Sequence, residues 1–103
     1  MARVYLSGPI TGHDDFLINF SLAKAKLMER GYEVVNPAQA CLSLPRSFEH
    51  EDYMKVCMAL LSCCDIIYML HGWDTSIGAK AELEWAMFHG LGIMSEDKDG
   101  EVG

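Results

Sequence analysis

The stretch that decides the fold is Asp-Ile-Ile-Tyr-Met-Leu at residues 65–70, which is almost entirely apolar. A short apolar run of this kind is typical of a central strand in a parallel sheet, because such a strand is buried on both faces. On its N-terminal side, residues 49–62 carry apolar side chains at helical spacing. On its C-terminal side, a second helix is predicted from residue 76 to 88 or 89, followed by a brief strand at 92–94.

The N-terminal third of the chain predicts a strand–helix–strand unit. Residues 4–6 form a short apolar strand, and residues 32–35 form a second one. Between them, residues 14–30 carry one apolar stripe at helical spacing, and Asp14 or Asp15 can cap this helix. Because a helix joins the two strands through short turns, the strands are predicted to be parallel.

The order of elements along the chain is β-α-β-α-β-α-β. This order predicts an α/β fold: a single-domain, three-layer, doubly wound (Rossmann- or flavodoxin-like) sandwich with a four- to five-stranded parallel sheet. We assign residues 1–94 to this domain. Residues 38–48 lack periodicity and are predicted to be a loop, and residues 95–103 are acidic, without apolar anchors, and are predicted to be a flexible tail.

The composition excludes several classes of protein. The chain has 103 residues, half of them apolar, with a net charge of −7, which indicates one globular domain. An acidic protein lacks the basic face that binding to polymeric nucleic acid needs, although a local pocket can still hold a nucleotide. No apolar run is long enough to span a membrane, and the chain enters its first strand without a leader segment, so we expect a cytoplasmic protein.

The four cysteines and four histidines show no metal-binding pattern. Cys63 and Cys64 are adjacent, which makes them an awkward disulfide pair, and no CxxC or Cys/His metal spacing joins them to Cys41 or Cys57. We therefore predict reduced, buried thiols, no metal and no cofactor. The histidines are scattered and are predicted to lie at the surface or at helix ends.

Three loops are selected by the position of the strands alone. In open parallel sheets, ligands bind outside the carboxyl ends of the strands, where the strand order reverses. The corresponding loops are residues 7–13, 36–48 and 71–78.

The first of these loops contains two glycines and a proline. Its residues Ser7, Gly8, Pro9 and Ile10 could bring backbone amides and a hydroxyl close to a ligand, or they could form an ordinary tight turn.

The third loop leads into a helix and is richer in polar groups. Ser76 can cap that helix, and the small residues around Gly78 leave amides of its first turn open to an anion such as phosphate. Glu82 lies less than two turns further on and can reach the same cleft, or it can merely complement the helix dipole. Trp73 could cover a ligand or pack on the end of the sheet. Glu84 is expected to point to solvent.

Three segments together resemble the small nucleoside 2-deoxyribosyltransferase-like proteins often labelled DUF4406. The segments are Val-Tyr-Leu-Ser-Gly-Pro-Ile-Thr-Gly at 4–12, Gly-Tyr-Glu-Val-Val-Asn-Pro at 31–37, and Gly-Trp-Asp-Thr-Ser-Ile-Gly-Ala-Lys-Ala-Glu at 72–82. The wider superfamily includes nucleoside deoxyribosyltransferases and nucleotide N-glycosidases. The resemblance covers residues 2–94.

The resemblance implies roles for individual residues. The nucleophilic glutamate of the family falls on Glu82, and the polar residue six positions before it falls on Ser76, which resembles the phosphate-accepting type of site. The aromatic residue that lines the sugar pocket matches Tyr5. The family usually has an aspartate at the position of Cys57, where it helps to hold the sugar and serves in acid–base chemistry.

The cysteine at position 57 leaves two interpretations open. A thiol is a poor replacement for a carboxylate, so either Asp74, Glu49 or a histidine compensates, or most of the catalysis has been lost. The resemblance therefore implies an N-glycosidase or deoxyribosyltransferase acting on (deoxy)nucleosides or their 5′-monophosphates, with Glu82, Tyr5 and Cys57 at the reacting centre. Ser7, Ser76 and the amides near Gly78 would hold the phosphate.

The alternative is a catalytically weakened protein that binds a nucleotide. A purely structural protein is the third possibility. The expected partner is a small nucleoside or nucleotide, with Pro9, Ile10, Trp73 and Asp74 completing its site. The protein is not expected to bind a membrane. By analogy with the wider family, we expect a homodimer or a larger homo-oligomer.

Overall fold

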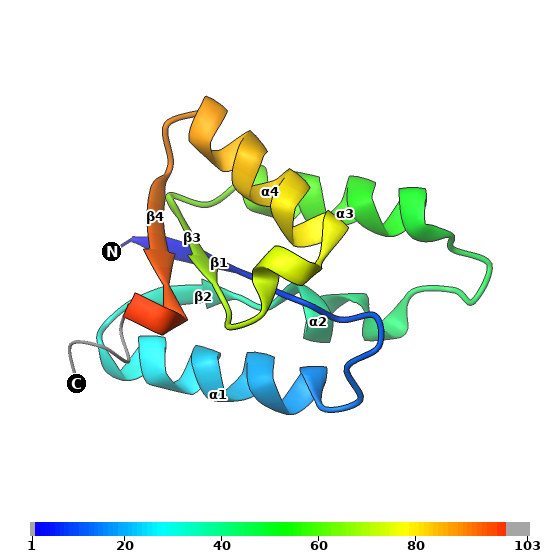
Figure 1. Cartoon of the computed structure of the whole chain (residues 1–103), viewed down its shortest axis with the longest axis horizontal. Helices are drawn as coiled ribbons and strands as arrows, with labels where there is room; N and C mark the ends of the chain where they lie inside the picture. Colours follow the sequence, from blue (N-terminus) through cyan, green and yellow to red (C-terminus); the bar gives the residue numbers. More distant parts are fainter. Residues whose placement is uncertain (1, 99–103) are drawn as a thin grey trace.

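The computed structural model describes residues 2–98 and contains one four-stranded sheet (Figure 1). Its strands are β1 (Arg3–Ser7), β2 (Glu33–Val35), β3 (Ile66–Met69) and β4 (Gly92–Ser95). The spatial order is β2-β1-β3-β4, and every neighbouring pair is parallel. The order reverses between β1 and β3, so the carboxyl ends of these two central strands form the switch point.

Helices cover both faces of the sheet (Figure 1). Helix α1 lies on one face, whereas α3 and α4 lie side by side on the other, which confirms the predicted three-layer sandwich. The helical elements are α1 (Phe16–Glu29), α2 (Pro37–Ala40), the 3-10 turn η1 (Cys41–Ser43), α3 (His50–Ser62), the 3-10 turn η2 (Trp73–Thr75) and α4 (Ile77–Phe88). No helix within residues 2–98 has the length and apolar character needed to cross a membrane.

The alternation of side chains along β1 divides the core into two halves. Val4 and Leu6 pack with α1, whereas Tyr5 packs in the opposite half with side chains of α3 and α4. Successive side chains of a strand point to opposite faces, so Ser7 shares the face of Tyr5. Both are almost fully buried. This parity determines which polar groups of β1 can meet α4.

Two sequence predictions need correction at the loops. The segment 38–48 is not wholly irregular, because α2 and η1 occupy its first part. The reason is local: the Asn36 side chain accepts a hydrogen bond from the Gln39 amide, and Pro37 stands in the first turn, which is a good start for a helix. At α1, Asp15 occupies the N-cap position but its side chain makes no capping hydrogen bond.

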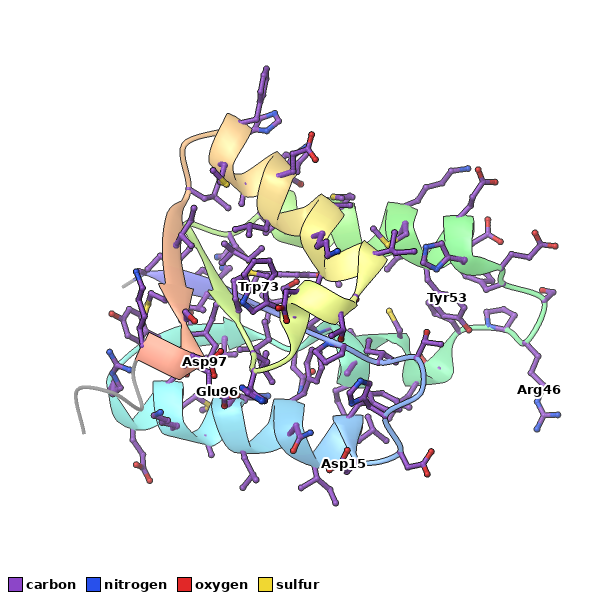
Figure 2. All side chains as sticks on the ribbon, viewed as in Figure 1. Asp15, Arg46, Tyr53, Trp73, Glu96 and Asp97 are labelled. Carbon is purple, nitrogen blue, oxygen red and sulfur yellow. The ribbon has the colours of Figure 1, made fainter. Side chains whose placement is uncertain are left out.

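The last described residues are part of the folded structure rather than of a tail. Ser95 ends β4, and residues 96–98 form a helical turn. Glu96 accepts a hydrogen bond from the His71 amide at 2.9 Å, and Asp97 lies 2.7 Å from His71 Nδ1 (Figure 2). These two side-chain contacts replace the apolar anchors that the sequence lacks there. Residues 99–103 of the predicted tail lie outside the described residues.

Candidate active site

Glu82 is a buried carboxylate whose two oxygens are both held by hydroxyl groups. It lies on α4, faces the sheet and is 6% exposed. The Tyr5 hydroxyl donates to Oε2 at 2.5 Å, and the Ser7 hydroxyl donates to Oε1 at 2.7 Å. Both donors come from the carboxyl-terminal half of β1, so the carboxylate stands at the switch point of the sheet.

Burial and hydrogen bonding act on these groups in opposite directions. Burial raises the pKa of Glu82 above its ordinary value, and the hydrogen bonds from Tyr5 and Ser7 partly oppose that rise. Burial also raises the pKa of Tyr5, and the neighbouring Glu82 charge raises it further. Tyr5 therefore remains a neutral hydroxyl that donates to the carboxylate. A buried carboxyl with a displaced pKa is a common mark of a functional site.

A cysteine lies close to this arrangement. The Cys57 side chain, on α3, packs against the half of the core that contains Tyr5. Burial is the main cause that raises the pKa of Cys57 to about 12, so it is a thiol at neutral pH.

The start of α4 lies close to α3. As predicted, Ser76 caps α4: its hydroxyl accepts from the Ala79 amide at 3.1 Å. The backbone amides of Ile77 and Gly78 belong to the first turn of the helix, so they have no hydrogen-bond acceptor within it. A Cβ at Gly78 would lie 3.3 Å from Met54 Sδ, so the first turn of α4 lies next to the Met54 side chain of α3.

The first and third loops pack against each other. A Cβ at Gly8 would lie 2.9 Å from Leu70 Cβ, which is too close for a real side chain. Gly72 has φ +85°, and a Cβ there would lie 3.4 Å from Pro9 Cγ. Close packing of the two loops therefore explains why residue 8 is a glycine. Ile10, in the middle of the first loop, is exposed.

The other predicted site residues make no hydrogen bond to Glu82 within residues 2–98. Trp73 is half-buried and packs on the core between the sheet and the α3/α4 layer (Figure 2), which supports its role in covering the end of the sheet. Asp74 is exposed on η2. Glu49 is engaged at the N-terminus of α3, where its amide donates to Asp52. Neither carboxylate shares a hydrogen bond with Glu82 in the part of the chain described. Glu84 is exposed, as expected.

The family profile described as Domain of unknown function (DUF4406) matches residues 2–95. The chain belongs to the DUF4406 family. A comparison with curated proteins gives no match. Two solved chains match this DUF4406 protein. One is a 2-deoxyribosyltransferase from the psychrotolerant bacterium Bacillus psychrosaccharolyticus, with 22% sequence identity and a TM-score of 0.73. The match covers 91% of this chain and 71% of that one, and it confirms the fold.

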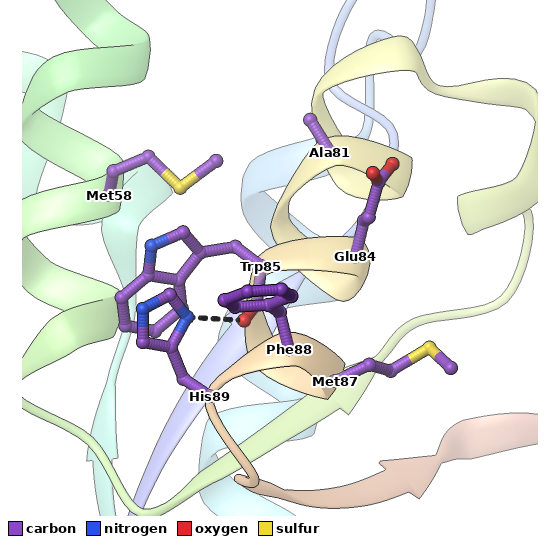
Figure 3. Close-up of a pocket in the computed structure, with 7 residues that line it drawn as sticks. All are labelled: Met58, Ala81, Glu84, Trp85, Met87, Phe88 and His89. Carbon is purple, nitrogen blue, oxygen red and sulfur yellow. Dashed lines mark hydrogen bonds between the residues drawn. The ribbon is translucent and has the colours of Figure 1, made fainter.

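A cavity of this DUF4406 protein that does not include Glu82 has a volume of about 650 Å³ and lies on the outer side of α3 and α4 (Figure 3). The Trp85 and His89 rings stack there at 3.8 Å, and Phe88 stands almost fully exposed beside them. Within residues 2–98 no group of three or more His, Cys, Asp and Glu side chains has the arrangement of a metal site.

The sequence predicts that Ser7 helps to hold a phosphate. In the structure its hydroxyl donates to Glu82 Oε1 at 2.7 Å.

Proposed function

We propose that this protein cleaves the N-glycosidic bond of (deoxy)nucleosides or their 5′-monophosphates, with Glu82 as the nucleophile. The observation that carries the proposal is the buried Glu82 carboxylate at the carboxyl ends of the central strands, with both oxygens held by Tyr5 and Ser7. Two short hydrogen bonds fix its orientation, and a nucleophile held in one orientation meets its target with little loss of entropy.

The proposed reaction has two steps. A Glu82 oxygen attacks the anomeric carbon through an oxocarbenium-like transition state, and the bond to the base breaks with its electron pair. The base leaves after taking up a proton, and a glycosyl ester of Glu82 remains. Water, or a second base, then displaces the carboxylate, so that the product retains the original configuration.

A 5′-phosphate would bind at the start of α4. The amides of Ile77 and Gly78 and the positive end of the helix dipole favour an anion there, with the Ser76 hydroxyl beside them. Arg46, the cation of the second loop, points outward from the molecule (Figure 2), so the anion would rely on the helix amides. Pro9, Ile10, Trp73 and Asp74 would line the outer part of the site.

The second candidate function is nucleotide binding without turnover, and Cys57 is the observation that favours it. Its thiol stands beside Tyr5 with a pKa of about 12. Such a group neither takes up nor releases a proton readily at neutral pH, so it is a weak partner for a leaving base.

Base release from a panel of ribo- and deoxynucleosides and their 5′-monophosphates tests both candidates. We expect the wild type to release base, Glu82→Ala to lose more than about a thousandfold of that activity, and the exposed Glu84→Ala on the same helix to keep it. Release only by Cys57→Asp would favour the binding protein, which isothermal titration with the same panel would then reveal. If no variant released base and none bound a member of the panel, the proposal would be overturned.

We also propose that two copies associate through the outer side of α3 and α4. Phe88 is 87% and Met87 62% exposed there, next to the cavity between the two helices. An exposed apolar patch of this kind is typical of an interface, and a two-fold dimer would bury it on both copies. Light scattering should show a dimer for the wild type and a monomer for Phe88→Asp.

The cytoplasmic location stays a prediction.

A further inference from the structure

Two hydrogen bonds that meet at His71 join the C-terminal turn to the third loop. The His71 backbone amide donates to Glu96 Oε1 at 2.9 Å, and the ring nitrogen Nδ1 lies 2.7 Å from Asp97 Oδ1. Both carboxylates belong to the helical turn at residues 96–98, which follows β4 (Figure 2). The segment after the edge strand β4 is thus tied to the loop after the central strand β3.

The contact of the His71 ring depends on whether the ring carries a proton. Its hydrogen bond with Asp97 is the main cause that raises the pKa of His71. The charges of Asp97 and Glu96, on the C-terminal turn, and of Asp74, on η2, act in the same direction. The protonated ring is therefore one cation among three carboxylates. When the ring is neutral, the carboxylates repel one another with no cation between them, and Asp97 keeps at most a hydrogen bond to an uncharged group.

These contacts hold the beginning of the third loop. Hydrogen bonds within the loop are local, because the amides of Trp73, Thr75 and Ser76 each donate to a carbonyl three residues earlier. They give the loop its shape but do not fix its position on the molecule. Trp73 packs its middle on the core, whereas His71 binds a residue that lies 25 positions further along the chain. Ser76 ends the loop and caps α4, so the position of the loop bears on the start of that helix.

We propose that the C-terminal turn is a proton-dependent latch on the third loop, which closes when the His71 ring is protonated and loosens when the ring is neutral. The latch consists of the two hydrogen bonds from His71 to Glu96 and Asp97. It is fully closed at pH values below the ordinary histidine pKa of about 6.5, and it loosens as pH rises through the raised pKa of the folded protein. Local opening of this kind leaves the rest of the fold intact.

The latch would also affect substrate binding. In the proposed glycosidase, Trp73 and Asp74 line the outer part of the site, and a loosened loop holds them less firmly against a substrate. Removal of the latch should therefore raise KM more than it lowers kcat, since Glu82 itself stays in place. This consequence rests on the proposed function, whereas the latch itself does not.

Hydrogen exchange of the His71 amide tests the latch, because the acceptor of that amide is a carboxylate of the C-terminal turn. NMR on the full chain measures the exchange rate on both sides of the ring titration, and division by the intrinsic rate at each pH gives the protection. We expect protection to fall about two- to fivefold as the ring loses its proton, the size expected of one exposed ion pair.

Three variants locate the cause of that fall. In His71→Gln, which keeps the amide but has no titrating ring, protection should not depend on pH. In Asp97→Asn the fall should be smaller, because the ring has lost its main partner. His89→Gln removes an exposed histidine at the end of α4 and should behave like the wild type.

Four results would overturn the proposal. The first is a His71 amide that exchanges at the intrinsic rate at every pH, and the second is a protection that does not change as the ring titrates. The third is a fall that persists in His71→Gln, because another group would then be its cause. The fourth is an equal fall at the Asp65 amide, which donates to the Arg3 carbonyl at the opposite end of the sheet, because the whole fold would then be opening. If base release is absent but the expected exchange pattern is found, the proposed function fails and the latch stands.

Discussion

At Glu82, burial and hydrogen bonding act on one carboxyl group in opposite directions. The side chain is removed from water, which favours its protonated form, while two hydroxyls donate to its charged form. Tyr5 and Ser7 are therefore positioning residues, which hold the carboxylate in place and keep its charge tolerable.

Tyr5→Phe tests the tyrosine. Loss of its hydroxyl should raise the pKa of Glu82 further, so the acid limb of the kcat/KM profile should move to higher pH. The variant should also be destabilised by about 1–3 kcal/mol, because a buried acceptor loses its donor. An NMR titration of the Glu82 carboxyl reads the pKa without relying on activity. Tyr53→Phe, which also removes a phenol hydroxyl, is the control, and equal effects of the two variants would contradict the assignment.

Glu82→Gln should stabilise the protein at neutral pH. The pKa of Glu82 is higher in the folded than in the unfolded state, so its favourable contribution is present below the unfolded value of about 4.3 and is lost as pH rises through the folded value. The gain in Tm should thus be largest at neutral pH and shrink toward pH 4. Glu84→Gln should show no such trend, and a gain that is independent of pH would speak against a buried charge.

At the level of elements, the short strands of the sheet and the tightly packed loops at their carboxyl ends determine where the side chains of the site lie. Side chains alternate along β1, so Tyr5 and Ser7 both point toward α4. The register of β1 with β3 places them beside Ile67 and Met69 on the same face. The small residues Ala79 and Ala86 of α4 are buried in this same half of the core.

Two glycines of these contacts should respond differently to alanine. Gly8→Ala should cost about 1–3 kcal/mol, because the new Cβ would lie 2.9 Å from the Leu70 Cβ, an atom tied to the backbone. Gly78→Ala meets only the flexible end of Met54 and gains helix propensity, so it should be neutral or stabilising. Urea unfolding of both variants measures the difference. Equal costs would show that the loop contact is looser than the structure has it.

At the scale of the whole molecule, the C-terminal turn is joined to the third loop. The pKa of His71 is raised, first by its hydrogen bond with Asp97 and then by the Asp97 charge. The contact therefore contributes fully at pH values below the ordinary histidine pKa of about 6.5 and is lost as pH rises through the raised value. It links the last strand to the loop that leads into α4.

Asp97→Asn should lower the pKa of His71 toward its ordinary value. NMR titration of the His71 ring measures this directly, with Asp15→Asn on the distant start of α1 as the control. An unchanged titration of His71 in Asp97→Asn would show that the two side chains do not meet in solution. Only a small change in stability is expected, because His71 is exposed.

The sequence by itself determined the order of elements, the parallel sheet and the three loops at its carboxyl ends, since these follow from apolar periodicity and from the geometry of crossovers. It also singled out Glu82, Tyr5 and Cys57 through motif resemblance. The α2 and η1 turns were missed, because four-residue elements have no periodicity to detect. The C-terminal turn was missed because its anchor, His71, lies 25 residues away from Glu96.

Only the tertiary structure decided which groups meet. The contact between Ser7 and Glu82 depends on which face of the sheet the Ser7 side chain points to and on how α4 is rotated about its own axis. Both are set by the packing of the helix layer on the sheet. The hydrogen bond from the His71 amide to Glu96 joins the third loop to the C-terminal turn, and no local rule relates the two positions. Contacts between distant segments depend on the burial of the whole core, which is why local sequence patterns could not supply them.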